Sequence, residues 1–332
     1  MLEHGGRLRL AARRHDIALP DWLDLSTGIN PEPYPVPPLT LSCWQRLPED
    51  DDGLEAAAAA CYGNDRLLVL PGSQAAIQSL PRLFPPQAIA CVSPLYEEHP
   101  HAWAKAGHKL RRLPSLSRAL AAATPVVLLC NPNNPTTTCL PRQILLEVAD
   151  LLRRRGGWLI VDEAFADAEP ENAVTPLAGS EEAPNLIALR SLGKFFGLAG
   201  ARVGFVFAAE EKLEPLREMI GPWAIAHPSR FAACHALQDH HWQIAMREKL
   251  KMASQRLAKL LAPLGIVRHT TLFCTVSGRE QPLEVDAMFE HFARRGVLIR
   301  RFDQHMLLRF GLPGSEPEWQ RLATALDEWR TS

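Results

Sequence analysis

The chain has 332 residues, 47% of them hydrophobic, and a formal net charge of −1 at pH 7. This length and composition allow a large core and two domains. The near-neutral charge argues against a nucleic acid or a membrane as a general partner. No apolar run has the length of a membrane span, and the first residues lack the apolar core of a signal peptide. Seven scattered cysteines without metal-ligand spacing predict reduced thiols in a cytoplasmic protein and no metal site.

The first 45 residues predict an arm of irregular structure. Five prolines between positions 31 and 38 remove backbone donors and prevent a continuous helix. A disordered tail is the alternative interpretation, but the apolar residues Trp22, Leu23 and Leu25 favour an arm that lies on another surface.

Helices and strands alternate after the acidic cluster 49–52, which is typical of a helix N-terminus. We predict helices at residues 54–61, 75–84 and 144–155, and strands at residues 67–70, 88–92, 109–113, 126–130, 158–161, 185–189 and 203–207. Such alternation indicates an α/β fold with a mostly parallel sheet covered on both faces. Ligands of these sheets bind beyond the carboxyl ends of the strands.

The rest of the chain predicts a smaller α+β domain. Residues 211–219 and 230–261 have helical patterns, as do residues 283–295 and 316–329, and strands are expected at 266–276, 297–301 and 305–310. We therefore predict an arm at 1–45 that joins the small domain and the active site, a large domain at 46–225 and a small domain at 226–332.

One lysine, Lys194, lies on a glycine-rich turn between two apolar strands. Burial lowers the pKa of an unpaired amine and makes it a nucleophile that can form a Schiff base. A solvated lysine on a surface loop is the alternative.

Polar residues also follow the other predicted strands. They are Ser73 and Gln74 after Pro71-Gly72, Tyr96 after Ser93-Pro94, Asn134 within Asn131-Pro132-Asn133-Asn134-Pro135-Thr136, Asp162, Arg300 and Arg309. Each has an ordinary structural explanation when taken alone: a tight turn, ring packing or a solvated charge.

Taken together, these motifs resemble pyridoxal-phosphate enzymes of the aspartate-aminotransferase fold (fold type I). The lysine segment carries their Ser-x-x-Lys pattern with an arginine eight residues on. The resemblance implies that Lys194 holds pyridoxal 5'-phosphate and that Tyr96 stacks on its ring. It also implies that Asn134 binds the phenolic oxygen of the cofactor and that Asp162 binds its ring nitrogen. The residues that bind the cofactor phosphate would be Ser73, Gln74, Ser191 and Arg202.

Three positions depart from the family pattern. Thr137 replaces a glycine at the exit of the asparagine loop, so the loop's exit is in question. Phe165 stands where many aminotransferases have a tyrosine. Leu47 stands where relatives often carry a tyrosine that reaches the neighbouring subunit's cofactor, so that bond is either missing or supplied by another residue.

Motifs in the N-terminal arm resemble one particular family among these enzymes. His4-Gly5-Gly6, with the segment from Ser26 to Pro31, resembles the threonine-phosphate decarboxylase family of cobalamin biosynthesis. That family converts O-phospho-L-threonine to (R)-1-amino-2-propanol O-2-phosphate. The resemblance implies a homodimer in which Lys194 and Asp162 are catalytic and the substrate contacts are His4, Gly5, Gly28, Asn134, Arg300 and Arg309. A histidinol-phosphate-type aminotransferase and a cofactor-sensing DNA-binding regulator are the alternatives.

Overall fold

The computed structural model describes residues 4–278 and 283–331, and the chain divides into two compact units. The large unit comprises Tyr34–Asn134 and Thr138–Ile244, and the small unit comprises residues 1–33, 135–137 and 245–332. These divisions differ from the predicted boundaries at 45 and 225. Helix α9 (His227–Gln238) belongs to the large unit, where it packs along α3 (Leu54–Tyr62). Residues 1–3, 279–282 and 332 of the predicted arm and small domain lie outside the described residues.

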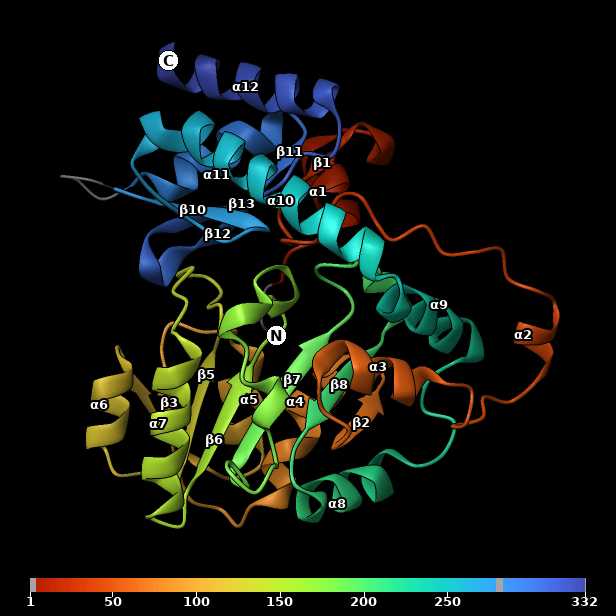
Figure 1. The fold of residues 1–332 in the computed structure, drawn as a ribbon. Helices are drawn as coiled ribbons and strands as arrows, with labels where there is room; N and C mark the ends of the chain where they lie inside the picture. Colours follow the sequence, from red (N-terminus) through yellow and green to blue (C-terminus); the bar gives the residue numbers. More distant parts are fainter. Residues whose placement is uncertain (1–3, 279–282, 332) are drawn as a thin grey trace. The chain divides into compact units, whose positions relative to one another are not determined.

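The large unit is built on a sheet of seven strands, and it confirms the predicted α/β class (Figure 1). The order across the sheet is β2 (Leu67–Leu70), β8 (Gly204–Phe207), β7 (Leu186–Ser191), β6 (Trp158–Asp162), β5 (Val126–Cys130), β3 (Ala88–Val92) and β4 (Lys109–Leu113). Strand β8 is antiparallel to both neighbours, and the other pairings are parallel.

Helices cover both faces of this sheet because its strands are apolar on both sides. Val126 and Leu128 of β5 join a core cluster with Ile77 of α4 (Ser73–Ser79) and Trp103 of α5 (Glu98–Lys105). Helix α8 (Glu210–Ile220) belongs to the same cluster. Helix α7 (Arg142–Arg153) buries four apolar side chains and lies on the near side of the sheet in Figure 1.

Two predicted helices differ from the observed ones, and two observed helices of the large unit were not predicted. Helix α5 was missed because Pro100 interrupts its helical pattern, and α6 (Leu116–Ala121) is short. The helix predicted at 75–84 ends at Ser79 and continues as a 3₁₀ turn containing Pro81. The helix predicted at 230–261 is two helices, because Asp239 ends α9 and caps the first turn of α10 (His240–Leu261) by accepting from Trp242 N at 2.9 Å.

The small unit contains an antiparallel sheet in the order β12 (Arg300–Phe302), β13 (Leu307–Gly311), β10 (Phe273–Ser277) and β9 (Ile266–His269). Its helices include α1 (Leu8–His15), α11 (Val285–Arg294) and α12 (Glu316–Thr331). The arm is fixed by β1 (Leu23–Asp24), which pairs in parallel with β11 (Val297–Leu298). The described arm residues 4–33 therefore pack as part of this unit.

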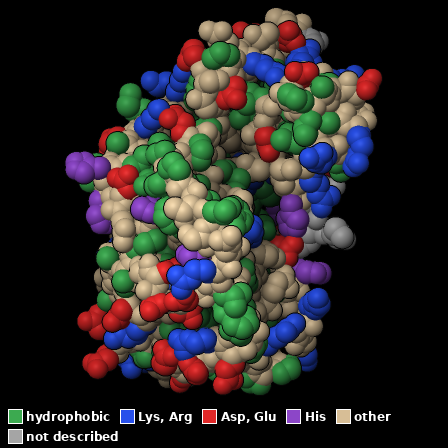
Figure 2. All heavy atoms as spheres, turned by 90° about the vertical axis from the view of Figure 1, so that its right-hand side faces the viewer, with side chains coloured by type: hydrophobic (Ala, Val, Ile, Leu, Met, Phe, Trp, Pro, Cys, Tyr) green, Lys and Arg blue, Asp and Glu red, His purple; other side chains and the backbone are tan. Residues whose placement is uncertain are grey.

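The surface carries both signs of charge. Figure 2 shows basic and acidic side chains intermingled on the face it draws, as the net charge of −1 leads one to expect. Among the described residues, no helix combines the length and the apolar character needed to cross a membrane. All seven cysteines are free.

One ion-pair cluster ties the start of the large unit to α9. Arg230 is 3% exposed and donates to both Asp52 oxygens and to Glu55 at 2.7 Å. Asp52 also accepts from Leu54 N at the start of α3. Burial raises the pKa of Asp52, but the bonds from Arg230 and Leu54 N outweigh it and hold that pKa below its ordinary value.

We predict that Arg230→Ala lowers the free energy of unfolding by about 3 kcal/mol, because the substitution leaves partly buried carboxylates without their cation. Urea unfolding measures the change. The matched control is Arg153→Ala, which breaks an exposed pair with Asp150 and is expected to change the free energy of unfolding much less. Equal losses in the two variants would contradict the assignment.

The same cluster predicts a pH dependence. Since the folded-state pKa of Asp52 is depressed, its contribution is present above the unfolded-state value and is lost as the pH falls through the folded-state value. The destabilisation caused by Asp52→Asn should therefore be constant above about pH 5 and shrink below about pH 4. Urea midpoints of both proteins from pH 7 to 3 test this, and a gap that widens in acid would count against it.

Candidate active site

The predicted site residues of the large unit gather at one edge of its sheet. Strands β3, β5, β6 and β7 are parallel, so their carboxyl ends meet at that edge. Strand β2 also ends there, because it is antiparallel to β8, which is itself antiparallel to β7. The segments after these strands carry the candidates Ser73, Tyr96, Asn134, Asp162 and Lys194.

Asp162, the last residue of β6, is 5% exposed and held by two hydrogen bonds. Its Oδ1 accepts from Ala164 N at 3.0 Å, and its Oδ2 accepts from His99 Nε2 at 2.7 Å. His99 lies in α5 and is 1% exposed. Burial, with Asp162 close by, raises the pKa of the neighbouring Cys130 thiol well above its ordinary value. A carboxylate is thus fixed in a largely water-free setting.

Several hydrogen-bond donors form a cradle where the turn before α4 meets the start of β8. Gly72 has φ +78°, and a Cβ there would lie 2.6 Å from Arg202 Nη2. A Cβ on Gly204 would collide with Ser73 N. Ser191 Oγ accepts from Gly193 N at 3.4 Å beside these residues in the sheet. The missing side chains therefore let the Arg202 guanidinium lie against Gly72 and the Ser73 N–H lie against Gly204.

Gln74 and Tyr96 form a second polar group next to the cradle. Gln74 Nε2 donates to Glu98 Oε2 at 2.8 Å, and Tyr96 OH donates to Gln74 Oε1 at 3.5 Å. Burial, with Glu98 and Asp162 nearby, raises the pKa of Tyr96 to about 12. Tyr96 is therefore a neutral ring at the strand end, and Gln74 is oriented by its neighbours.

The asparagine loop uses two of its amides to hold its own shape. Asn131 exchanges bonds with the backbone of Leu140, at 3.0 and 2.7 Å, and Asn133 Nδ2 donates to Pro94 O at 3.0 Å. These bonds fix the turn that presents Asn134. At the exit, Thr137 has φ +65°, so the left-handed backbone usual for glycine is kept by a β-branched residue.

Lys194 is half-buried, and its ammonium lies 5.5 Å from the centroid of the Phe165 ring. The phenylalanine ring offers the lysine an aromatic face and no hydroxyl. Lys194 and Asp162 thus occupy the ends of adjacent segments at the same sheet edge.

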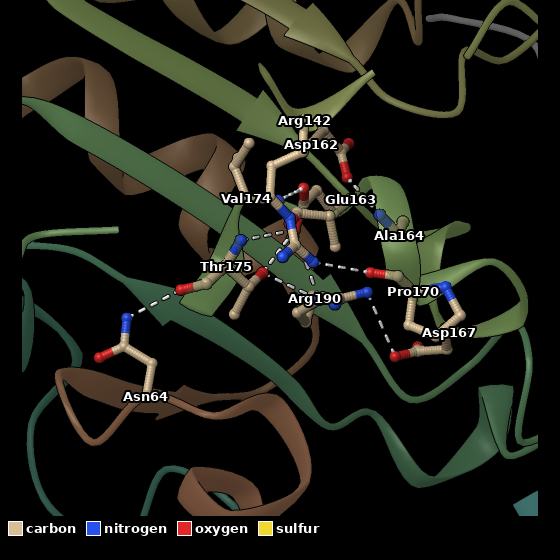
Figure 3. A network of polar contacts seen from close by, with 11 residues as sticks. Asn64, Arg142, Asp162, Glu163, Ala164, Asp167, Pro170, Val174, Thr175 and Arg190 are labelled. Carbon is tan, nitrogen blue, oxygen red and sulfur yellow. Dashed lines mark hydrogen bonds and ion pairs between the residues drawn. The ribbon is translucent and has the colours of Figure 1, made fainter. Parts of the chain in front are cut away.

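A buried ion network lies behind these strand ends (Figure 3). Arg190 Nη1 lies 3.3 Å from Asp167 Oδ1, and its Nε lies 3.5 Å from Glu163 Oε2. Glu163 also accepts from Val174 N at 2.6 Å and Thr175 N at 3.2 Å. Burial lowers the pKa of Arg190, but Asp167 and Glu163 outweigh it and raise that pKa above its ordinary value. Because strand side chains alternate, Arg190 and Ser191 of β7 lie on opposite faces of the sheet. Glu163 and Asp162 likewise bond to different partners.

In the small unit, Arg300 and Arg309 are paired directly across β12 and β13. Like charges at directly opposite positions destabilise a sheet, so an anion between or beside them is favoured. Arg309 is 5% exposed, donates to Ser26 O at 2.5 Å and lies over Phe273 and Phe302. The register, which the sequence does not reveal, brings the two predicted arginines together.

His4, Gly5 and Arg300 line one cavity of about 110 Å³ in the small unit. Its other basic lining residues are Arg7, Arg14, His15 and Arg301, and none of the described lining residues is acidic. Gly28 is buried with φ +63° and does not line this cavity. That φ explains a glycine at this position.

Sequence reasoning missed His99, Glu163, Arg190 and Ser26. His99 lies in the helix that was not predicted, although a histidine three residues after Tyr96 was a usable signal. Glu163 and Arg190 directly adjoin predicted site residues, but only the alternation of the observed strands shows which face they occupy.

Comparisons with known proteins agree with this geometry. A model of the family described as aminotransferase class I and II matches residues 47–328. Threonine-phosphate decarboxylase of Pseudomonas aeruginosa is 49% identical over 331 residues, which cover 98% of this chain and 97% of that protein. The enzyme of the same name from Sinorhizobium sp. is 38% identical and covers 97% of each. The structure of histidinol-phosphate aminotransferase from Sinorhizobium meliloti in complex with pyridoxal-5'-phosphate superposes with a TM-score of 0.82 at 21% identity, covering 99% and 95% of the two chains.

The backbone of Thr137 generates a prediction. An L-residue in the left-handed region is strained by ~1–2 kcal/mol, of which the greater chain entropy of glycine offsets a part. Thr137→Gly should therefore raise the free energy of unfolding by about 1 kcal/mol in urea titrations. Thr138→Gly is the control and should lower it by about 0.5–1 kcal/mol. A loss at both positions would show that Thr137 makes contacts worth more than its strain.

Proposed function

Because the chain belongs to the aminotransferase class I and II family, we propose that it binds pyridoxal 5'-phosphate at Lys194 and decarboxylates O-phospho-L-threonine. The product is (R)-1-amino-2-propanol O-2-phosphate, a precursor of the cobalamin side chain. The observation that carries the proposal is the full-length similarity to two threonine-phosphate decarboxylases. The similarity to the histidinol-phosphate aminotransferase, at 21% identity, is one of fold alone.

The residues of the large unit fit this cofactor. The cradle of Arg202, Ser73 N and Ser191, opened by Gly72 and Gly204, suits a phosphate. Tyr96 offers an aromatic face for the ring, Asn134 takes the phenolic oxygen, and Gln74 orients Tyr96 beside the cradle. Asp162, oriented by His99, suits a protonated ring nitrogen. When bound, the cofactor supplies an electron sink for the bond that breaks.

The chain's own groups then have separate tasks. A carboxylate at ~4 Å from a cation contributes about 4 kcal/mol at an effective dielectric of 20, so Asp162 keeps the ring nitrogen charged. His99 prevents Asp162 from turning away. Lys194, once released, donates the proton that Cα of the substrate needs after CO₂ has left.

The small unit supplies the substrate's anion sites. Arg309 binds the α-carboxylate through its planar fork, and the cavity of His4, Gly5 and Arg300 binds the phosphate. Gly28 and Asn134 contribute further contacts. The paired arginines support this assignment because an anionic substrate relieves their repulsion.

We also propose a cytoplasmic homodimer. The large unit exposes Leu41 (72%), Trp44 (67%), Leu47 (61%) and Trp223 (60%), which is unusual for a surface that stays in water. A second copy of the chain would cover such side chains. Leu47 has no hydroxyl, so a cross-subunit bond to the cofactor phosphate would have to come from another residue.

We expect purified protein with pyridoxal 5'-phosphate to release CO₂ from O-phospho-L-threonine without any keto acid. Lys194→Ala should lower that rate by roughly a thousandfold or more and abolish labelling of the cofactor by borohydride. The exposed Lys109→Ala is the control and should behave as the wild type. A strict requirement for a keto acid would favour the aminotransferase alternative instead.

A further inference from the structure

Ser26 connects two parts of the small unit that the proposed function assigns to opposite ends of the substrate. It is the second residue after the end of β1, and its side chain is buried, with 1% of the residue exposed. The preceding residue, Leu25, fixes the backbone of this segment through two hydrogen bonds. Leu25 N donates to Leu298 O at 2.8 Å, and Leu25 O accepts from Gly311 N at 2.7 Å.

The hydroxyl of Ser26 is oriented by a carboxylate. Asp24 Oδ1 accepts from Ser26 N at 2.9 Å and from Ser26 Oγ at 2.6 Å. Since the hydroxyl proton is committed to Asp24, the oxygen acts as an acceptor, and it accepts from Gly6 N at 2.7 Å. The hydroxyl thereby fixes the turn that carries His4 and Gly5.

The backbone of Ser26 sets the spacing on both sides. A Cβ on Gly5 would collide with Ser26 O, so this turn packs directly against the serine. The same carbonyl oxygen accepts from Arg309 Nη2 at 2.5 Å. One residue thus contacts the turn beside the phosphate cavity and also the guanidinium assigned to the carboxylate.

We propose that Ser26 is a positioning residue that sets the distance between the two anion sites, an inference that rests on the proposed function. In O-phospho-L-threonine the carboxylate and the phosphate are joined by a short chain of fixed length. A rigid Ser26 bridge therefore selects amino acids phosphorylated on the β-hydroxyl over those with no phosphate or a longer side chain.

The test uses holoenzyme variants of Ser26. Ser26→Ala removes the acceptor of Gly6 N and one of the two hydrogen bonds that Asp24 accepts from this residue, and the KM for O-phospho-L-threonine should rise about tenfold, equivalent to ~1.4 kcal/mol. The KM should change more than kcat. Discrimination against O-phosphohomoserine and unphosphorylated threonine should fall, while the dissociation constant of pyridoxal 5'-phosphate should stay unchanged. Ser26→Thr keeps the hydroxyl and should restore discrimination.

The control is Ser254→Ala, because Ser254 is 2% exposed in the same unit and its hydroxyl donates to the helix carbonyl of Lys251. It should retain wild-type KM and discrimination. If Ser26→Ala does not fold, Ser26→Cys, with a weaker acceptor of similar shape, carries the test. Unchanged discrimination in the Ser26 variants, or the same loss in Ser254→Ala, overturns the inference.

A failure of the proposed function is recognised separately. If the wild type releases no CO₂, calorimetric titration with the same three amino acids still measures discrimination by binding. Selective weakening for O-phospho-L-threonine in Ser26→Ala would then support the positioning role although the decarboxylation had failed.

Discussion

The large unit depends on the buried pair of Glu163 and Arg190. Glu163 directly follows the last residue of β6, and Arg190 is the penultimate residue of β7, so each directly adjoins a residue that we assign to the cofactor. Both charges are almost fully removed from water, so either one alone would cost several kcal/mol, about 3–5 by analogy with other broken pairs. The pair, together with Asp167 and Thr175, therefore holds β6 and β7 in one register. Alternation along β7 then places Ser191 on the face opposite Arg190, and Asp162 ends β6 directly before Glu163, so the ion pair helps to fix the positions of both residues.

The small unit uses charge in the opposite way. Two arginines face each other across adjacent strands, an arrangement that a sheet tolerates only with compensation. Aromatic rings beneath Arg309 and the carbonyl of Ser26 supply a part of it. Under the proposed function, an anionic substrate adds further compensation. The large unit thus places opposite charges together in its interior, whereas the small unit places two like charges at directly opposite positions.

The sequence predicted the features that depend on local pattern. Apolar runs located the strands of both sheets, and the polar residues after them fell at one edge because parallel topology requires it. What depends on register or on a distant partner was not predictable. Asp239 divides a helix through its cap, His99 meets Asp162 across 63 positions, and Arg300 faces Arg309 because of a strand pairing. Thr137 shows a third case, since the backbone keeps the conformation that its usual glycine would have and the strain is invisible in the sequence.

Under the proposed function, the two units have different effects on the reaction. The large unit determines how easily a bond at Cα breaks, and the small unit determines which bond breaks. Asp162 and its histidine determine the electron demand of the ring, and they belong to the large unit. The groups assigned to the substrate's two anions belong mainly to the small unit. A substrate held at both anions retains little freedom beyond rotation about the line that joins them, so the spacing of the anion sites selects the bond at Cα that is aligned for cleavage.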